Sequence, residues 1–332
     1  MPPLVSFDEA VTNARLPQAG SDLMIAIDMD GTTLHPDMSV SARVVQAIQA
    51  HLAAGTKIIV ATGRDIPGAH YAIHAIGIPA GHAVVLNGAA TLAFHDSISG
   101  GAARVGSDRL AELSPGSSAH QAASLADESE YRFSDLYPHA DPGVFQDGDF
   151  HYSVLEAHSF NPTVEIEALH NVLPQAYIAV ERLNKPRLVS HHFPPGELIG
   201  ESIVVPIDEL CVDDATRVTV RAMNMTPADM ADVVADVGLH GVEFSIGYTA
   251  WLDIAPEGIS KAVALEKLRQ YIGISSDATV AVGDSGNDLD MLSWAHLGVV
   301  MGQAPDYVKA HAMTETASVE EDGLALALER LL

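Results

Sequence analysis

The feature that most constrains this chain is a short apolar segment that ends in two acidic residues. Residues 23–27 are all apolar, and Asp28, Met29, Asp30 and Gly31 follow directly. An apolar run of this length predicts a strand buried on both faces, as in a parallel sheet. Because side chains alternate along a strand, the two carboxylates should point toward one site at its C-terminal end. Two like charges this close need a cation, a shared proton or a chemical role.

One role fits the order of these residues. Asp28 would be a carboxylate nucleophile and Asp30 the neighbouring acid or base, while Gly31 lets the chain turn sharply. The same residues also suit a turn after a strand or the start of a calcium loop. The calcium loop is the weaker alternative, because its further oxygen ligands and closing Glu are missing from the sequence.

The following segment predicts the first repeat of a parallel sheet. Ser41 can cap a helix whose apolar residues share one face, and Gly55 ends it. Residues 57–61 then form a second apolar strand. Strand, helix and strand at this spacing indicate a right-handed βαβ unit.

Thr62, Gly63 and Arg64 stand at the end of this second strand. Ligands of open α/β sheets bind at the C-terminal ends of the strands, so a hydroxyl, a flexible backbone and a guanidinium there suit a phosphoryl group. The alternative for Thr62 is an ordinary helix cap. A third strand over residues 82–86 follows, and regular alternation then stops.

The composition and patterning of residues 91–247 predict an inserted domain. Residues 91–247 are rich in Pro and mix strand-like with helical pieces, which indicates an α+β domain. Residues 22–90 and 248–332 would form the core, and residues 1–21 an N-terminal extension. In the second core segment Lys261 begins a helix, and a strand over 278–282 leads into Gly283, Asp284, Ser285, Gly286, Asn287 and Asp288.

The composition excludes several classes of partner. With 17 Lys and Arg against 44 Asp and Glu, the formal net charge of −27 argues against nucleic acid and anionic membranes as partners. No apolar run approaches the roughly 20 residues that span a bilayer, and no secretory leader is evident. We therefore expect a cytoplasmic protein.

Four of these segments, taken in order, resemble the four motifs of the haloacid dehalogenase-like (HAD) hydrolases. They are Asp28-x-Asp30-Gly-Thr, Thr62, Lys261 and Gly283-Asp284-x-x-Asn287-Asp288. Asn87-Gly88-Ala89 and the tail beginning Ala304-Pro305-Asp306 resemble the Cof-type branch, which carries a type IIB cap. The resemblance implies a Rossmann-like, doubly wound parallel sheet core with an inserted α+β cap domain that governs specificity.

The resemblance also implies a phosphatase of small phosphomonoesters, such as sugar phosphates, that acts through an aspartyl-phosphate. Asp28 would attack phosphorus, and Asp30 would protonate the leaving oxygen. Thr62 and Lys261 would hold the phosphoryl group as catalytic residues, with Gly63, Arg64 and Asn287 as further substrate contacts.

Magnesium is the implied cofactor. Asp28, the main-chain carbonyl of Asp30, and Asp284 would bind it, and Asp288 would bind directly or support them. Two alternatives stay open. A phosphomutase would return the phosphoryl group to a sugar, and an inactive phosphate-binding regulatory module would keep the fold without turnover. Under each of these alternatives the expected partner is a small phosphorylated molecule.

Overall fold

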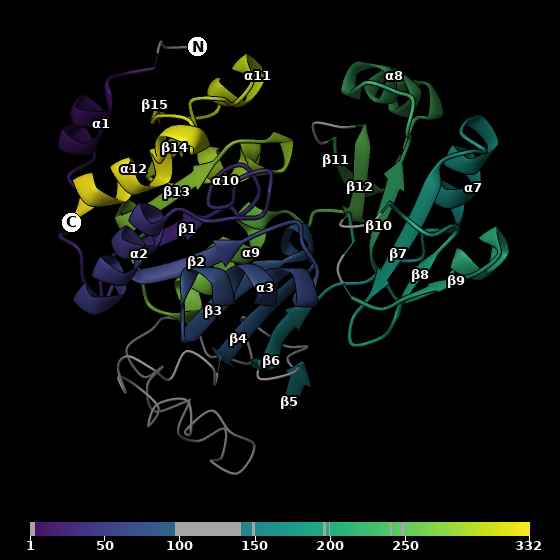
Figure 1. The fold of residues 1–332 in the computed structure, drawn as a ribbon, viewed down its shortest axis with the longest axis horizontal. Coiled ribbons are helices and arrows are strands. Elements are labelled where there is room, and N and C mark those ends of the chain that lie inside the picture. The colour runs from purple at the N-terminus through teal and green to yellow at the C-terminus, as the bar shows by residue number, and fades with distance from the viewer. Residues whose placement is uncertain are drawn as a thin grey trace.

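The structure, a computed structural model, describes residues 4–96, 141–147, 150–194, 197–198, 200–239, 241–246 and 250–332. These residues form two sheets that lie side by side (Figure 1). The first has the strand order β15-β14-β13-β1-β2-β3-β4-β6-β5, and the second the order β11-β12-β10-β7-β8-β9.

Six neighbouring strands of the first sheet run parallel, as the apolar segments predict. They are β1 (Met24–Ile27), β2 (Lys57–Ala61), β3 (Ala80–Val85), β13 (Thr279–Gly283), β14 (Leu297–Val300) and β15 (Thr314–Glu315). Three antiparallel strands extend the sheet beyond β3, namely β4 (Ala90–Asp96), β6 (Phe150–Ala157) and β5 (Asp141–Asp147).

Helices cover both faces of this sheet, because alternate residues of the central strands point to opposite sides. Ile25 and Ile27 of β1 belong to one apolar cluster with residues of α1, α2, α3 and α12, whereas Met24 and Ala26 belong to another with α9 and α10. The helices are α1 (Phe7–Ala14), α2 (Ala42–Ala54), α3 (Ile66–Ile76), α9 (Lys261–Tyr271), α10 (Leu289–Trp294), α11 (Asp306–Lys309) and α12 (Gly323–Leu331).

Among the residues that the structure describes, helices pack on one face of the second sheet only. Its strands are β7 (Tyr177–Arg182), β8 (Arg187–Val189), β9 (Ser202–Val204), β10 (Ala215–Arg221), β11 (Val242–Ile246) and β12 (Trp251–Pro256). The helices α7 (Thr163–Val172) and α8 (Pro227–Val237) pack on it through a separate apolar cluster. Both helices lie on the side of this sheet that faces away from the first sheet (Figure 1).

The strands that belong to each sheet do not match the domain boundaries predicted at 91 and 247. β4 and β6 hydrogen-bond into the first sheet, although the inserted domain was expected to begin at 91. β12 pairs with β10 and β11 of the second sheet, although it was expected in the core. Antiparallel strands need no helical crossover, so the sheet continues past the point where βα alternation stops.

The segment predicted as an N-terminal extension packs on the core. Ala10 of α1 is fully buried, and Val5 forms a bridge with Thr314 of β15. In the part of the chain that the structure describes, no helix is both long and apolar enough to cross a membrane.

Candidate active site

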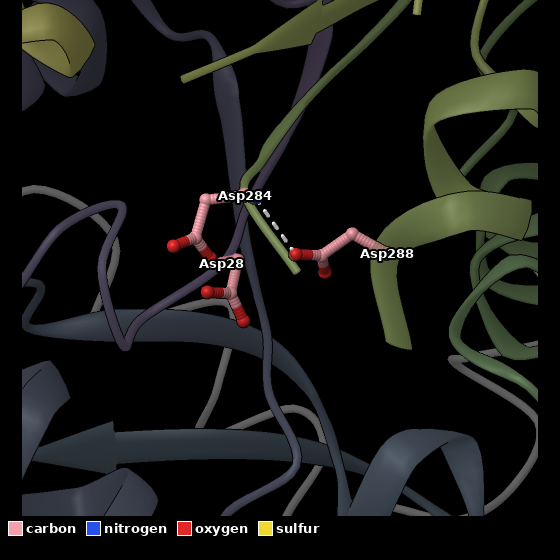
Figure 2. Close-up of side chains that lie close together, drawn as sticks. All are labelled: Asp28, Asp284 and Asp288. Atoms are coloured by element: carbon pink, nitrogen blue, oxygen red, sulfur yellow. Dashed lines mark hydrogen bonds between the residues drawn. The ribbon is translucent and has the colours of Figure 1, made fainter. Parts of the chain in front are cut away.

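The central strands bring three carboxylates to one edge of the first sheet. Asp28 follows β1, Asp284 follows β13, and these two strands are neighbours. Asp288 ends a short 3₁₀ turn (Gly286–Asp288) before α10. All three side chains are buried, and one oxygen from each lies within 4.8 Å of the others. The carboxylates point toward one another from three segments (Figure 2).

Lys261 supplies a positive charge inside this cluster. It is the first residue of α9, and its fully buried Nζ donates to Asp28 Oδ1 at 2.6 Å and to Asp288 Oδ1 at 2.8 Å. Burial alone would lower the pKa of Lys261, but the neighbouring carboxylates of Asp28 and Asp288 raise it. The ammonium is therefore charged, and three carboxylates still outnumber it.

The excess of negative charge fits a divalent cation. Burial, and then the charge of Asp288, raise the pKa of Asp28 well above its usual range, although Lys261 opposes the shift. A cation beside Asp28 would favour the ionised carboxylate that a nucleophile needs. Converging, buried carboxylate oxygens are the donors that magnesium prefers.

Close packing of the backbone fixes the three carboxylates. Gly31 has a φ of +80°, and a Cβ there would lie 2.2 Å from Asp284 Oδ2, so only glycine fits. Thr33 Oγ1 donates to the main-chain carbonyl of Asp28 at 2.6 Å. Asp288 Oδ2 accepts from the backbone N–H groups of Asp284 at 2.9 Å and Ser285 at 3.0 Å. Asp288 thus anchors the loop that carries Asp284.

The loop after β2 lies next to the loop that carries Asn287. The buried hydroxyl of Thr62 accepts from the Arg64 N–H at 3.1 Å. A Cβ on Gly63 would lie 2.9 Å from Asn87 Oδ1 and 3.3 Å from Asn287 Nδ2. Asn287 Nδ2 itself donates to Asn87 Oδ1 at 2.8 Å. Only glycine therefore leaves room for this asparagine pair at position 63. Asn87 was not among the predicted site residues, although it lies next to them.

Arg64 binds Asp30 with both ends of its guanidinium. Its Nε donates to Asp30 Oδ2 at 2.8 Å, and its Nη2 donates to Asp30 Oδ1 at 2.5 Å. The Arg64 side chain is 14% exposed and that of Asp30 is 59% exposed. Burial opposes the charge, but the bond to Asp30 raises the pKa of Arg64. Direct contact of Arg64 with a substrate stays a prediction.

Gln303 also reaches the carboxylate cluster, although no sequence motif indicated this residue. Its Nε2 donates to the Gly31 carbonyl at 2.5 Å and to Asp284 Oδ2 at 3.1 Å. Its Oε1 accepts from the Val319 N–H at 3.0 Å, which orients the amide. The only local signal was its position just after the end of β14.

Residues of the second sheet touch the same edge of the first. Asn87 Nδ2 donates to Asp253 Oδ2 of β12 at 3.2 Å, and Arg217 of β10 donates to the Gly63 carbonyl. Arg187 of β8 donates to Asp65, which follows Arg64. No local pattern singles out these residues, because their role depends on how the two sheets meet.

Comparison with known proteins identifies the family of this chain. The family model described as haloacid dehalogenase-like hydrolase matches residues 25–100 and 224–328, which together make more than half of the chain. This chain belongs to the haloacid dehalogenase-like hydrolase family. Its Cof-type resemblance, its α/β core and its inserted α+β cap domain are all in keeping with that membership.

Three similar proteins illustrate the relation. The 5-amino-6-(5-phospho-D-ribitylamino)uracil phosphatase YitU of Bacillus subtilis is 34% identical over 119 residues, which are 35% of this chain and 44% of YitU. YxeH of the same bacterium is 25% identical over 311 residues, or 93% of this chain and 98% of YxeH. The structure of the HAD subclass IIB sugar phosphatase BT4131 has a TM-score of 0.64 at 20% identity, with 93% of this chain and 100% of that chain covered. That likeness concerns the fold alone.

Proposed function

We propose that this protein is a magnesium-dependent phosphatase that hydrolyses small phosphomonoesters, such as sugar phosphates, through an aspartyl-phosphate on Asp28. The observation that carries this proposal is the buried Asp28 carboxylate, 2.6 Å from Lys261 Nζ inside a cluster of three carboxylates. A nucleophile, a fixed positive charge and a site for a cation are what phosphoryl transfer to a carboxylate requires. Membership of the hydrolase family and phosphatase-named relatives support it.

In the first half-reaction an Asp28 carboxylate oxygen attacks phosphorus as the bond from phosphorus to the leaving oxygen breaks. Asp30 gives its proton to that leaving oxygen, and the alcohol departs. Lys261 and the loop of Thr62 would hold the non-bridging oxygens, whose charge they offset. The product of this step is an aspartyl-phosphate.

In the second half-reaction a water oxygen attacks the phosphorus of the aspartyl-phosphate. Asp30, now ionised, takes a proton from that water, and the bond from phosphorus to the Asp28 oxygen breaks. Inorganic phosphate leaves and both carboxyl groups return to their starting states. The exposed position of Asp30, at the rim of the buried cluster, suits this exchange of protons with substrate and water.

Asp28, Asp284 and the main-chain carbonyl of Asp30 would hold the cation, and Asp288 would fix the Asp284 loop through its two backbone contacts. When bound, magnesium offsets the charge of the carboxylates and of the phosphoryl oxygens. Gln303 would orient Asp284, since it already donates to one oxygen of that carboxylate.

We infer that the cap comprises the residues between β6 and α9, about 158 to 260, and covers the catalytic edge. The contacts of Arg217 with Gly63 and of Asp253 with Asn87 support this assignment. A cap in this place excludes water and admits only small substrates. The net charge of −27 further disfavours nucleic acid and anionic membranes. A cytoplasmic location stays a prediction.

The test is a turnover assay with purified protein, magnesium and a panel of phosphomonoesters, in which free phosphate and isomerised products are both measured. We expect free phosphate. An isomerised sugar phosphate would instead identify a phosphomutase, and binding without turnover an inactive module. Asp290→Asn is a suitable control, because Asp290 is exposed and lies two residues beyond Asp288.

A further inference from the structure

A series of hydrogen bonds between side chains joins the catalytic edge to the cap. Asn87 Nδ2 donates to Asp253 Oδ2 of β12 at 3.2 Å, and Asn87 Oδ1 accepts from Asn287 Nδ2 at 2.8 Å. Asn287 Oδ1 in turn accepts from Ser285 Oγ at 2.7 Å. We call Ser285, Asn287, Asn87 and Asp253 the hydrogen-bond chain. It begins in the loop that carries Asp284 and ends in the cap sheet.

This hydrogen-bond chain has one direction only, because Asp253 stands at its end. A carboxylate accepts hydrogen bonds and cannot donate them, whereas an amide presents either its NH₂ group or its oxygen. Asp253 therefore requires the NH₂ group of Asn87, which turns the oxygen of Asn87 toward Asn287. Asn287 must then present its own NH₂ group, and its oxygen is left to accept from Ser285. A carboxylate in the cap thus decides which end of a core amide faces Asn87.

Neighbouring donors hold the Asp253 carboxylate in place. Thr219 Oγ1 donates to Asp253 Oδ1 at 2.7 Å, and Trp251 Nε1 donates to the same oxygen at 3.1 Å. These bonds leave Oδ2 directed at Asn87. Arg217 Nη1 lies 3.6 Å from Oδ2 and offsets its charge, and the Asp253 side chain is only 13% exposed. Asp253 is therefore a fixed acceptor at the seam between cap and core.

The backbone holds Asn87 against the loop that follows β2. Three successive residues have positive φ angles, namely Leu86 at 54°, Asn87 at 55° and Gly88 at 102°. Such a conformation is costly for leucine and persists only where the surrounding contacts enforce it. Here the N–H groups of Leu86 and Asn87 donate to the carbonyls of Arg64 at 2.9 Å and Thr62 at 3.1 Å. The turn places the buried amide of Asn87 directly beside Thr62 and its loop.

The direction of the hydrogen-bond chain matters because of what lies beside Asn287. A Cβ on Gly63 would lie 3.3 Å from Asn287 Nδ2, so this nitrogen borders the loop that is predicted to hold the phosphoryl group. One hydrogen of the NH₂ group goes to Asn87, and the second can donate to a phosphoryl oxygen. In the reverse direction the oxygen of Asn287 would take this place and would repel the phosphoryl oxygens.

We propose that Asn87 and Asp253 are positioning residues, which keep the NH₂ group of Asn287 turned toward the phosphoryl group. This inference rests on the proposed phosphatase function and adds two residues to it. The carboxylate of Asp253 acts through Asn87 and touches neither the phosphorus nor the nucleophile. Without that carboxylate both amides can turn over, and the donor beside the phosphoryl group is no longer fixed.

The test uses two single variants and their combination. In Asp253→Asn the new amide oxygen stays on Trp251, whose indole can only donate, so its NH₂ group faces Asn87 and reverses the hydrogen-bond chain. Asn87→Asp instead places two carboxylates together. We expect either change to lower kcat on p-nitrophenyl phosphate at least about tenfold, with a smaller change in KM.

The combined variant exchanges the carboxylate and the amide. The carboxylate at position 87 can then accept from the amide at position 253 and from Asn287, so kcat should return to within about threefold of wild type. Asn161→Asp is the matched control, because Asn161 Nδ2 donates to Asp213 Oδ1 at 2.6 Å in an exposed pair of the same kind. This control should keep the wild-type kcat.

A further comparison separates the hydrogen-bond chain from the contact of Arg217 with Gly63. In Asn287→Ala the amide is absent, so adding Asp253→Asn should lower kcat no further. An additional loss of about tenfold in that background would overturn the proposal, because the effect would then pass through Arg217. This comparison also decides the case in which Asn87→Asp does not fold.

Binding of inorganic phosphate in the presence of magnesium, measured by calorimetry, distinguishes failure of the two proposals. Asp253→Asn should weaken phosphate binding, and the combined variant should restore it. Phosphate release that is equal in wild type and Asp253→Asn would overturn the positioning role and leave the phosphatase standing. Absence of release from every ester, together with weakened and restored phosphate binding, would overturn the phosphatase and support the positioning role. Unchanged phosphate binding in Asp253→Asn would overturn the positioning role.

Discussion

The catalytic cluster and the seam between the two domains both bury charged side chains, but they balance the charges differently. In the catalytic cluster Asp28, Asp284 and Asp288 surround one ammonium, that of Lys261. At the seam, which comprises Asp65, Glu181, Arg187, Arg217 and Asp253, two guanidiniums face three carboxylates. Arg187 binds Glu181 of its own domain and Asp65 of the core.

This difference in charge balance distinguishes a site that binds a ligand from a contact that joins two domains. Opposite charges in nearly equal number attract one another across the seam, so they join the domains. Surplus carboxylates repel one another, and only the surrounding fold, with Gly31 packed against Asp284, keeps them together. The seam needs no ligand, whereas under the proposed function a cation and a phosphoryl group would complete the catalytic cluster.

The largest expected effect is that of Asp28→Asn. The change removes the nucleophile, so kcat should fall at least about 1,000-fold. Without metal, the melting temperature should stay equal or rise, because one repelling charge is lost. Phosphate release and thermal unfolding measure the two effects, with Asp290→Asn as control. A variant that kept more than a few per cent of wild-type kcat would rule out the covalent mechanism.

Removal of the cation should have the next largest effect. Chelation should lower activity at least about 100-fold, since three carboxylates then face the phosphate dianion. Added magnesium should also raise the melting temperature of the wild type, and raise it less in Asp284→Asn. Full activity after exhaustive chelation would mean that the cluster is not a cation site.

At the seam, Arg187→Met should weaken the fold more than the chemistry. The change leaves Asp65 without its buried guanidinium partner and Glu181 with only its longer contact to Arg217, so the free energy of unfolding should fall by about 3 kcal/mol. Arg43→Met is the matched control, because Arg43 and Glu329 form a surface pair, each 42% exposed, and solvent screens that pair so that its loss should lower stability much less. Equal losses in chemical denaturation would show that the seam does not join the domains.

The smallest effect concerns His82 in β3, which lies outside both clusters. Burial, with a smaller contribution from Lys57, lowers the pKa of His82 to about 4 from its usual 6.5. The unfolded chain therefore binds the proton more tightly, and stability should fall as the pH drops from 6.5 to 4. Because His82 is only partly covered, we expect a loss of about 1–2 kcal/mol.

His82→Gln should remove this part of the acid sensitivity, as measured by denaturation at pH 7 and pH 4.5. Asp28→Asn should instead change the pH dependence of stability that arises from the catalytic cluster, because Asp28 carries one of its three carboxylates. Identical pH dependence in the wild type and His82→Gln would contradict the assignment to His82.

Much of the core could be predicted from local patterns. The apolar strands β1, β2 and β13 are buried throughout or nearly so, and each ends in the residues that were expected to carry the chemistry. Parallel strands align their carboxyl ends, so Asp28 and Asp284 had to meet once their strands were identified as neighbours. Lys261 joined them because its helix begins at the same edge.

The remaining parts depend on contacts between distant segments. β4 and β6 belong to the first sheet through antiparallel pairing. Such pairing needs no crossover helix, so no helical pattern in the sequence indicates it. Arg64 is bound by Asp30, 34 residues earlier, and Arg217 meets Gly63 across 154 residues. Such partners are set by how the two domains pack, and neither sequence periodicity nor a short motif encodes that arrangement.

The position of Lys261 has a consequence for the timing of turnover. Only four residues, 257 to 260, connect the last cap strand, β12, to this lysine. The main chain at Ser260 is pressed against Gly88, where a Cβ would lie 2.3 Å from the Ser260 carbonyl oxygen. A movement of the cap relative to the core would therefore be taken up within residues 257–259, before the contact of Ser260 with Gly88. The ammonium of Lys261 would then stay beside Asp28 while the cap opens to release product, so the site would be ready for the next phosphate as soon as the product has left.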